Sequence, residues 1–101
     1  MILEAAVLAV RGGEEAAFEA AMTKAAPVIA GAAGYIDHEV QRSMETPGRY
    51  LLLVRWETLE AHTVGFRGSP AFAEWRALIS PFFASPPAVE HYDSVLEWPV
   101  L

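Results

Sequence analysis

Segment 49–57, Arg-Tyr-Leu-Leu-Leu-Val-Arg-Trp-Glu, constrains the fold more than any other part of the chain. Its length and its aromatic and branched residues predict a β-strand, whose successive side chains point to opposite faces. Both faces are rich in apolar residues, with Tyr50, Leu52, Val54 and Trp56 on one and Leu51, Leu53 and Arg55 on the other. An open antiparallel sheet with helices on one side is normally polar on its other side. We therefore expect a second copy of the chain to cover the second face, in a homodimer with sheet packed on sheet.

The first half of the chain predicts a strand, a helix and a second strand. Residues 2–10 form a short apolar run that stops at Arg11-Gly12-Gly13, as a buried strand does. Residues 14–30 then carry apolar side chains at helical spacing, and Pro27 is expected to kink or interrupt this helix near Ala26. Residues 35–44 alternate as a strand, with Ile36 and His38 expected on one face and Tyr35 on the other. Thr46-Pro47-Gly48 predicts a turn that joins this strand to segment 49–57 as a hairpin.

The second half predicts a short helix, a longer helix and a last strand. Thr58 is a candidate N-cap for a helix over 59–66, and Ser69-Pro70 predicts the start of the longer helix, with Ser69 as its cap. Ser80-Pro81 ends that helix, and residues 88–98 are expected to form a strand. The order β-α-β-β-α-β predicts an α+β, ferredoxin-like fold, in which helices cover one face of an antiparallel sheet.

Composition limits the classes of protein to which the chain can belong. A chain of 101 residues is too short for a second core, so we expect one domain over residues 1–101. It has no cysteine for disulfides or thiolate metal sites, and its net charge of -6 argues against a nucleic-acid partner. Neither a membrane-spanning run nor a cationic leader is found, which predicts a cytoplasmic domain without a membrane partner.

Three segments together resemble the antibiotic biosynthesis monooxygenase (ABM) domain. They are 54–62, Val-Arg-Trp-Glu-Thr-Leu-Glu-Ala-His, 66–72, Phe-Arg-Gly-Ser-Pro-Ala-Phe, and Gly34-Tyr35-Ile36 with His38-Glu39. The resemblance extends over nearly the whole chain and implies a dimeric α/β barrel of ferredoxin-like protomers. Members of this family include cofactor-free oxygenases of anthrone-like and hydroquinone-like substrates, and also heme-degrading oxygenases.

The resemblance also implies where a substrate pocket lies. In the anthrone oxygenases a strand-end Trp, an aromatic hydroxyl group, an Arg and an Asn line the pocket; Trp56 and Arg76 match the Trp and the Arg. His62 stands in place of the aromatic hydroxyl group and keeps a proton-transfer group there, while Leu52 stands in place of the Asn. The residues that heme degradation needs are absent at the corresponding positions, which argues against that activity.

Two functions remain open at this stage. One is a cofactor-independent monooxygenase for a small aromatic or quinol-type substrate, with His62 as the base and Arg76 holding the anion. The other is a non-catalytic dimeric module that binds a small apolar or aromatic ligand or serves a stress response. For each candidate there is also a purely structural interpretation: a histidine bonded to a backbone carbonyl, an arginine paired with a surface glutamate, and aromatic rings in the core. No metal or cofactor is expected, and the substrate-contacting candidates are Trp56, Leu52, Phe66, Phe72 and His38.

Overall fold

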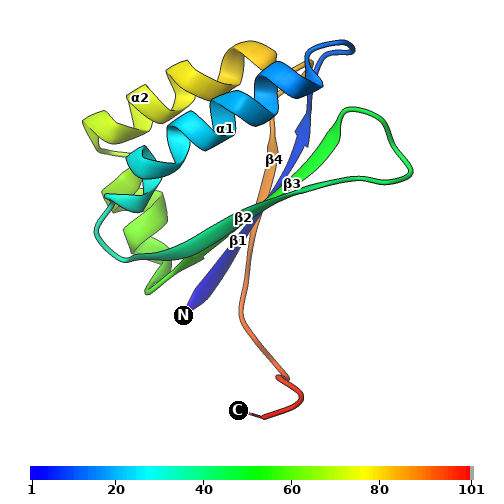
Figure 1. Cartoon of the computed structure of the whole chain (residues 1–101). Helices are drawn as coiled ribbons and strands as arrows, with labels where there is room; N and C mark the ends of the chain where they lie inside the picture. Colours follow the sequence, from blue (N-terminus) through cyan, green and yellow to red (C-terminus); the bar gives the residue numbers. More distant parts are fainter. Residues whose placement is uncertain (101) are drawn as a thin grey trace.

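The computed structural model describes residues 1–100 and has the predicted element order (Figure 1). Four strands form one antiparallel sheet in the order β2-β3-β1-β4, so the first strand lies in the middle, between the third and the last. The α+β, ferredoxin-like prediction is confirmed. The elements are β1 (Ile2–Ala9), α1 (Glu15–Ala30), β2 (Tyr35–Arg42), β3 (Arg49–Trp56), η1 (Ala61–Phe66), α2 (Pro70–Ile79), η2 (Ser80–Phe82) and β4 (Ala88–Tyr92).

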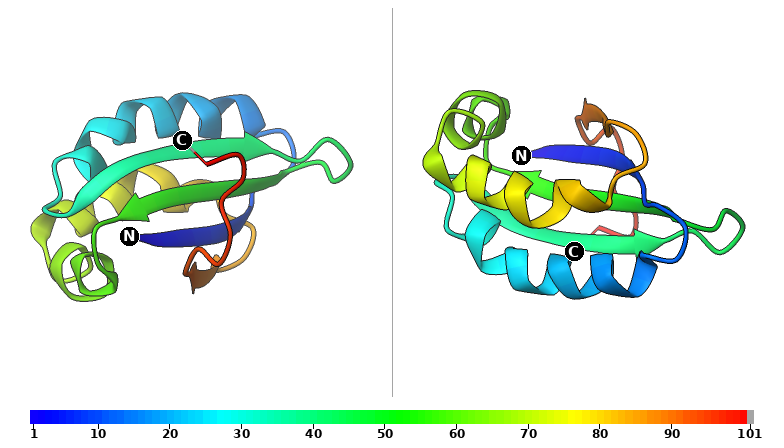
Figure 2. Two further views of the ribbon diagram at one scale, coloured as in Figure 1. Left: turned by 90° about the horizontal axis from the view of Figure 1, so that it is seen from below. Right: turned by 90° about the horizontal axis from the view of Figure 1, so that it is seen from above.

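The core lies between the sheet and the two long helices, which cover the same face (Figure 2). The even-numbered side chains of β3 point into it, as the alternation predicts, and Trp56 and Val54 are fully buried there. Phe18 of α1 is also fully buried and lies 4.8 Å, centroid to centroid, from the ring of Tyr50. Burial of such large apolar side chains contributes about 1.5–3 kcal/mol each.

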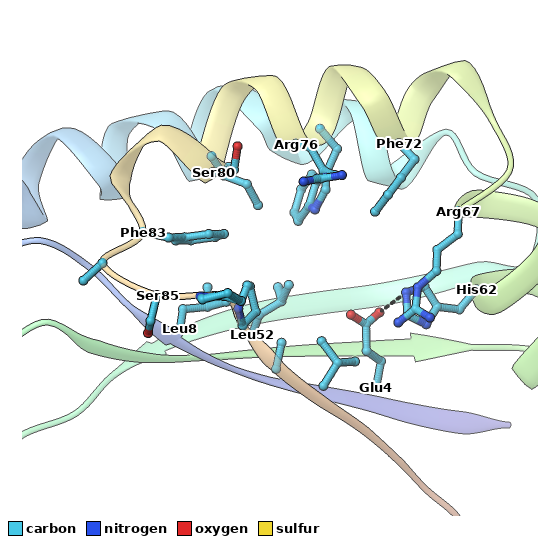
Figure 3. A pocket seen from close by; sticks show the side chains of 17 residues that line it. Glu4, Leu8, Leu52, His62, Arg67, Phe72, Arg76, Ser80, Phe83 and Ser85 are labelled. Atoms are coloured by element: carbon cyan, nitrogen blue, oxygen red, sulfur yellow. Dashed lines mark ion pairs between the residues drawn. The ribbon is translucent and has the colours of Figure 1, made fainter.

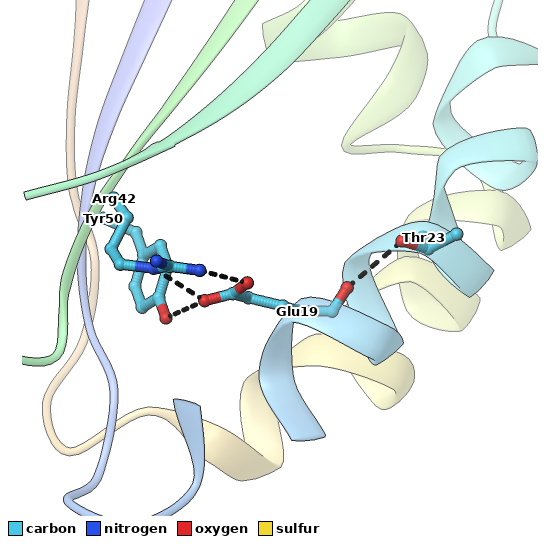
Figure 4. Close-up of polar contacts among 4 residues, drawn as sticks. All are labelled: Glu19, Thr23, Arg42 and Tyr50. Carbon is cyan, nitrogen blue, oxygen red and sulfur yellow. Dashed lines mark hydrogen bonds and ion pairs between the residues drawn. The ribbon is translucent and has the colours of Figure 1, made fainter. Parts of the chain in front are cut away.

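A polar cluster ties α1 to the end of the hairpin (Figure 4). The guanidinium of Arg42 donates two hydrogen bonds to Glu19, at 2.9 and 2.6 Å, and the hydroxyl of Tyr50 donates one at 2.6 Å. The helix continues unbroken through Pro27, so of the predicted kink or interruption near Ala26 the interruption is wrong. Pro27 is exposed and lies in the last turn, so its ring displaces no core side chain and the helix continues for only three residues beyond it.

Two strand predictions need correction. A bulge between Tyr35 and Asp37 places two residues of β2 opposite one of β3, which reverses the expected facing of Tyr35 and Ile36. The ring of Tyr35 therefore contacts Trp56 on the helix side, while Ile36 lies on the outer side of the sheet. The last strand ends at Tyr92 instead of continuing to residue 98, because Tyr92 already pairs with Leu3, close to the start of β1.

The connection from β3 to α2 is a wide, π-helical turn, η1, that the sequence predicts as a short helix. Thr58 acts as its predicted cap, accepting a hydrogen bond at 3.1 Å from the N–H of Ala61. Ser69, in contrast, does not cap α2; its hydroxyl donates to the carbonyl of Phe66 at 2.7 Å. Gly34 has a φ of 83° and lies against Ala61, so a glycine is needed to let η1 approach the start of β2.

No helix of residues 1–100 covers the outer face of the sheet (Figure 2, left). Val7 and Leu51 are about two-fifths exposed on this face, with exposed fractions of 40% and 38%. After β4 the chain runs below the sheet and projects away from it (Figure 1), and Leu96 and Trp98 there are almost fully exposed. Within the described residues, no helix combines the length and apolar character needed to cross a membrane.

Candidate functional site

A cavity of about 580 Å³ lies between the sheet and α2, near the edge formed by β4 (Figure 3). Its floor comes from β1, β3 and β4, its roof from α2, one end from η1 and the residue after it, and the other end from segment 83–87. This volume is within the range of sites for small organic ligands. The walls are mostly apolar, and four charged or titratable side chains line the cavity: Glu4, His62, Arg67 and Arg76.

Glu4 is the unexpected member of this set. It lies on the core-facing side of β1 and is only 6% exposed, although carboxylates are rarely buried without partners. The indole N–H of Trp56 donates a hydrogen bond to Oε1 of Glu4 at 2.9 Å. The same oxygen lies 3.3 Å from Nε2 of His62. The second oxygen, Oε2, takes part in neither contact, and the carboxylate borders the cavity floor (Figure 3).

His62 links this carboxylate to a second histidine. Its ring is 3% exposed and stacks on Trp56, with centroids 5.2 Å apart and planes 18° apart. Its Nδ1 lies 2.8 Å from Nε2 of His91 on β4. Because Nε2 faces Glu4 and Nδ1 faces His91, both ring nitrogens have a partner within the protein.

Burial shifts the protonation of these groups. It raises the pKa of Glu4, against the opposing effects of the Trp56 hydrogen bond and the positive charge of Arg67. It lowers the pKa of His62 to about 4, with the charges of Arg67 and His91 acting in the same direction. A neutral His62 can donate from Nε2 to Glu4 only if its Nδ1 accepts from His91. With Glu4 ionised and both rings neutral, the order of donors that satisfies these contacts runs from His91 to His62 to Glu4.

Two arginines bring positive charge to the cavity. Arg76 projects from α2 on the side opposite Glu4, and Arg67 reaches toward His62 from the end of η1 (Figure 3). Within residues 1–100, neither guanidinium has a carboxylate oxygen within 4.0 Å, whereas Arg42 and Arg55 are paired with Glu19 and Asp37. The carbon at the centre of the Arg76 guanidinium lies 5.8 Å from the ring centroid of Phe72, which is a cation–π contact.

Comparison with known proteins assigns the family. The model of the antibiotic biosynthesis monooxygenase domain matches residues 1–78. The chain belongs to the antibiotic biosynthesis monooxygenase (ABM) family. The ABM assignment agrees with 50% identity over 95 residues to the uncharacterised protein YczJ of Bacillus subtilis (strain 168), covering 94% of this chain and all of YczJ.

Solved structures agree with the ABM fold. A crystal structure from Bordetella bronchiseptica, assigned to the same monooxygenase family, has a TM-score of 0.92 at 45% identity and covers 94% of this chain and 97% of its own. SnoaB from Streptomyces nogalater, a cofactor-independent oxygenase, has a TM-score of 0.78 at 18% identity, covering 98% of this chain and 97% of its own. At that identity SnoaB shows a shared fold.

The ABM cavity brings together some of the residues proposed from the sequence and not others. Leu52, His62, Phe72 and Arg76 line it. Trp56 and Phe66 lie behind it in the core, where Trp56 holds Glu4 and contacts Phe66 at a centroid distance of 5.6 Å. His38 lies outside the cavity, hydrogen-bonded to the hydroxyl of Tyr35. Burial lowers the pKa of His38, as it does for His62 and His91.

The sequence analysis does not identify Glu4, Arg67 or His91 as residues of the candidate site. Glu4 shares its strand face with Ala6 and Leu8, so it was recognisable as a carboxylate on a buried face once that face had been identified. His91 shares a face with Val89, but its contact with His62 depends on β4 lying next to β1. No sequence pattern indicated that the side chain of Arg67 would reach the cavity. Within residues 1–100, no cluster of three or more His, Cys, Asp or Glu side chains is arranged to hold a metal ion.

Proposed function

We propose that this ABM protein is a cofactor-independent monooxygenase acting on a small aromatic or quinol-type substrate in the cavity. The observation that carries the proposal is the Glu4–His62 pair, a buried carboxylate and imidazole at the floor of an otherwise apolar cavity of about 580 Å³. Buried titratable groups with shifted pKa values are typical of acid–base sites. The cofactor-independent activity of SnoaB, which shares the fold, gives additional support.

In this proposal the pair acts as one base. Our sequence-based hypothesis makes His62 alone the base, but both of its nitrogens face protein partners. A substrate hydroxyl at the cavity floor would meet Oε2 of Glu4, and His62 would donate from Nε2 to Oε1 and so stabilise the carboxylate. Burial raises the pKa of Glu4 toward the values at which a carboxylate is an effective base near neutral pH.

Other groups would hold the substrate and its anion. Phe72 and Leu52 supply apolar contacts from the roof and the floor. Arg76 points into the cavity opposite Glu4, where its guanidinium can stabilise the negative charge that develops on the deprotonated substrate (Figure 3). Trp56 and Phe66 lie in the core next to the cavity. Trp56 would fix the position of Glu4, and Phe66, packed on Trp56, would fix that of η1.

The proposed reaction draws its electrons from the substrate. Removal of a proton gives an electron-rich anion, which reduces O2 and forms a carbon–oxygen bond. The peroxide anion formed in this way is protonated to a hydroperoxide, and loss of water then breaks the O–O bond. For an anthrone-type methylene group the balance is CH2 plus O2 giving C=O plus H2O; for a hydroquinone, the products are a hydroxyquinone and water. One oxygen atom of O2 thus enters the product and the other becomes water.

The test is oxygen uptake by protein that has been freed of metal ions and flavin. A panel of anthrones and hydroquinones is supplied with ¹⁸O2, and product and water are examined for label. We expect one labelled oxygen in the product, and a rate about 10²–10⁴-fold lower in His62→Ala. Thr63→Ala, on the same turn, serves as the matched control, because its side chain bonds to the carbonyl of Leu59 and lies outside the cavity lining.

Two results would contradict the proposal. Equal rates in the wild type and His62→Ala would show that His62 takes no part in the chemistry, so that Glu4 and His62 do not act as one base. If no member of the panel consumes O2 in the presence of wild-type protein but several bind, the second hypothesis, a non-catalytic ligand-binding module, replaces the first.

The assembly we propose is a homodimer formed through the outer face of the sheet. Leu3, Val7, Leu51 and Leu53 lie on this face, which no helix of residues 1–100 covers. Apolar side chains of the tail after β4 are exposed beside it: Val95, Leu96, Trp98 and Val100. Contiguous exposed apolar surface of this kind usually marks an interaction site. A second copy offers a surface of the same polarity, and a two-fold axis lets both protomers bury this face together.

A further inference from the structure

We propose that the ligand of the cavity is a hydroxylated aromatic acid, whose carboxylate is held by Arg67 and Arg76 while its hydroxyl group faces Glu4. The inference rests on the proposed function for the hydroxyl end of the ligand, and it adds a negative charge to the substrate class.

The first argument is the distribution of charge. The chain carries thirteen acidic and seven basic residues, so its surface is acidic on average. The cavity is an exception, since Glu4 is its single Asp or Glu and two guanidiniums line it. With Glu4 ionised, these three groups sum to one positive charge, and a monoanionic ligand would make the site neutral. Electrostatic complementarity of this kind selects ligands by charge.

The second argument is that, among residues 1–100, neither guanidinium forms an ion pair with a carboxylate. Of the described residues, Glu4 interacts electrostatically with Arg67, but no carboxylate lies within 4.0 Å of Arg67 or Arg76. A neutral quinol would leave these donors to water. A carboxylate accepts paired hydrogen bonds from a guanidinium, and this geometry makes arginine the usual residue for recognising organic acids.

The third argument is the arrangement of the cavity. Arg76 descends from α2 on the wall opposite Glu4, and Arg67 reaches in from the end of η1 beside His62 (Figure 3). The two guanidiniums and Glu4 therefore border the same end of the cavity, with Arg76 above and Glu4 below. Away from these charged groups the lining is apolar, with Leu8 and Leu52 on the floor and Phe83 toward the other end (Figure 3). A flat ring that turns a carboxylate toward the guanidiniums, a hydroxyl group toward Glu4 and its apolar edge toward Phe83 matches this arrangement.

A different role for the arginines makes a different prediction. If they only stabilise an anion formed during the reaction, a neutral substrate should bind as well as an acid, and their loss should lower kcat without weakening binding. If they recognise a carboxylate, their loss should weaken the binding of the unreacted acid. Binding without oxygen separates these two roles.

The experiment compares 2,5-dihydroxybenzoate with its methyl ester by anaerobic calorimetric titration near neutral pH and at low salt. We expect the acid to bind at least about tenfold more tightly than the ester, and Arg67→Gln and Arg76→Gln each to weaken binding of the acid about tenfold or more without changing that of the ester. Arg49→Gln is the matched control, since Arg49 lies on β3 outside the cavity lining. Added KCl should weaken binding of the acid to the wild type but not that of the ester, a readout that needs no variant.

The inference is overturned if the wild type binds acid and ester equally, or if Arg49→Gln weakens the acid as much as the two cavity variants do. Oxygen uptake measured on the same ligands reports separately on the proposed function. If oxygen uptake with the ester has the same KM as with the acid, the proposed oxygenase activity is supported and the proposed selection of a negatively charged substrate is contradicted. Arginine-dependent binding of the acid without uptake of oxygen by any member of the panel would support the charge selection and contradict the oxygenase.

Discussion

The protonation state of His62 gives the sharpest physical prediction, because it decides how the pair works. Burial lowers the pKa of this imidazole from 6.5 to about 4. Each factor of ten in proton affinity is worth about 1.4 kcal/mol, so this change corresponds to about 3 kcal/mol. At neutral pH the ring should therefore be neutral and act as a donor to Glu4 rather than as the positive partner of an ion pair.

The effect on stability has a definite sign. Since the pKa of His62 is lower in the folded state than in the unfolded one, the unfolded chain binds more protons between pH 6.5 and pH 4. The free energy of unfolding should fall across that window as the pH is lowered, by up to about 3 kcal/mol for His62. Glu4 acts in the opposite direction, because its raised pKa favours the folded state as the carboxyl is protonated. The contribution of His62 is therefore measured as a difference between wild type and His62→Gln.

Two measurements check the prediction. A titration of the three imidazoles by NMR should show His62 changing protonation near pH 4, and urea unfolding should show the wild type losing up to about 3 kcal/mol more than His62→Gln between pH 7 and pH 4. A midpoint of 6 or higher for His62 would refute the reasoning. It would mean that the ring is protonated beside an ionised Glu4 and that the attraction between them outweighs the burial of both.

Three further variants test other parts of the structure. Gly34→Ala should lower the free energy of unfolding by about 1–3 kcal/mol, because φ is 83° there and a Cβ would lie 2.6 Å from that of Ala61; urea unfolding measures it. Phe18→Ala should lower it by about 3–5 kcal/mol in the same assay, because the ring is fully buried. Leu51→Lys should convert the proposed dimer into a monomer of unchanged secondary structure, as judged by sedimentation and circular dichroism, and a wild type that is already monomeric would contradict the proposed interface.

The fold was largely predictable, because periodicity and turn residues report directly on local structure. The alternation of β3 and the Thr46-Pro47-Gly48 turn both predict what the structure shows. The bulge at Ile36 was not predictable from alternation, since one extra residue reverses the facing of its neighbours without changing the composition. The end of β4 depends on its partner strand, and that information lies elsewhere in the chain.

The candidate site was less predictable, because it is assembled from distant segments. His62 and Arg76 were predicted as cavity residues, on the basis of a family resemblance, and both line the cavity. The partners that give His62 its chemistry lie 58 residues before it and 29 residues after it, at Glu4 and His91. Ala5 and Ala6, which follow Glu4, blur the alternation of β1, so only the paired sheet identifies its buried face.

The measurement that tests the central claim most directly is the initial rate of oxygen uptake by Glu4→Gln. The substitution keeps the size of the side chain and its place beside Trp56 but removes the proton acceptor, and Glu90→Gln on the outer face of β4 is the matched control. We predict a rate about 10²–10⁴-fold below the wild type for Glu4→Gln and an unchanged rate for Glu90→Gln, with no metal ion or flavin present. A Glu4→Gln protein as fast as the wild type would contradict the account.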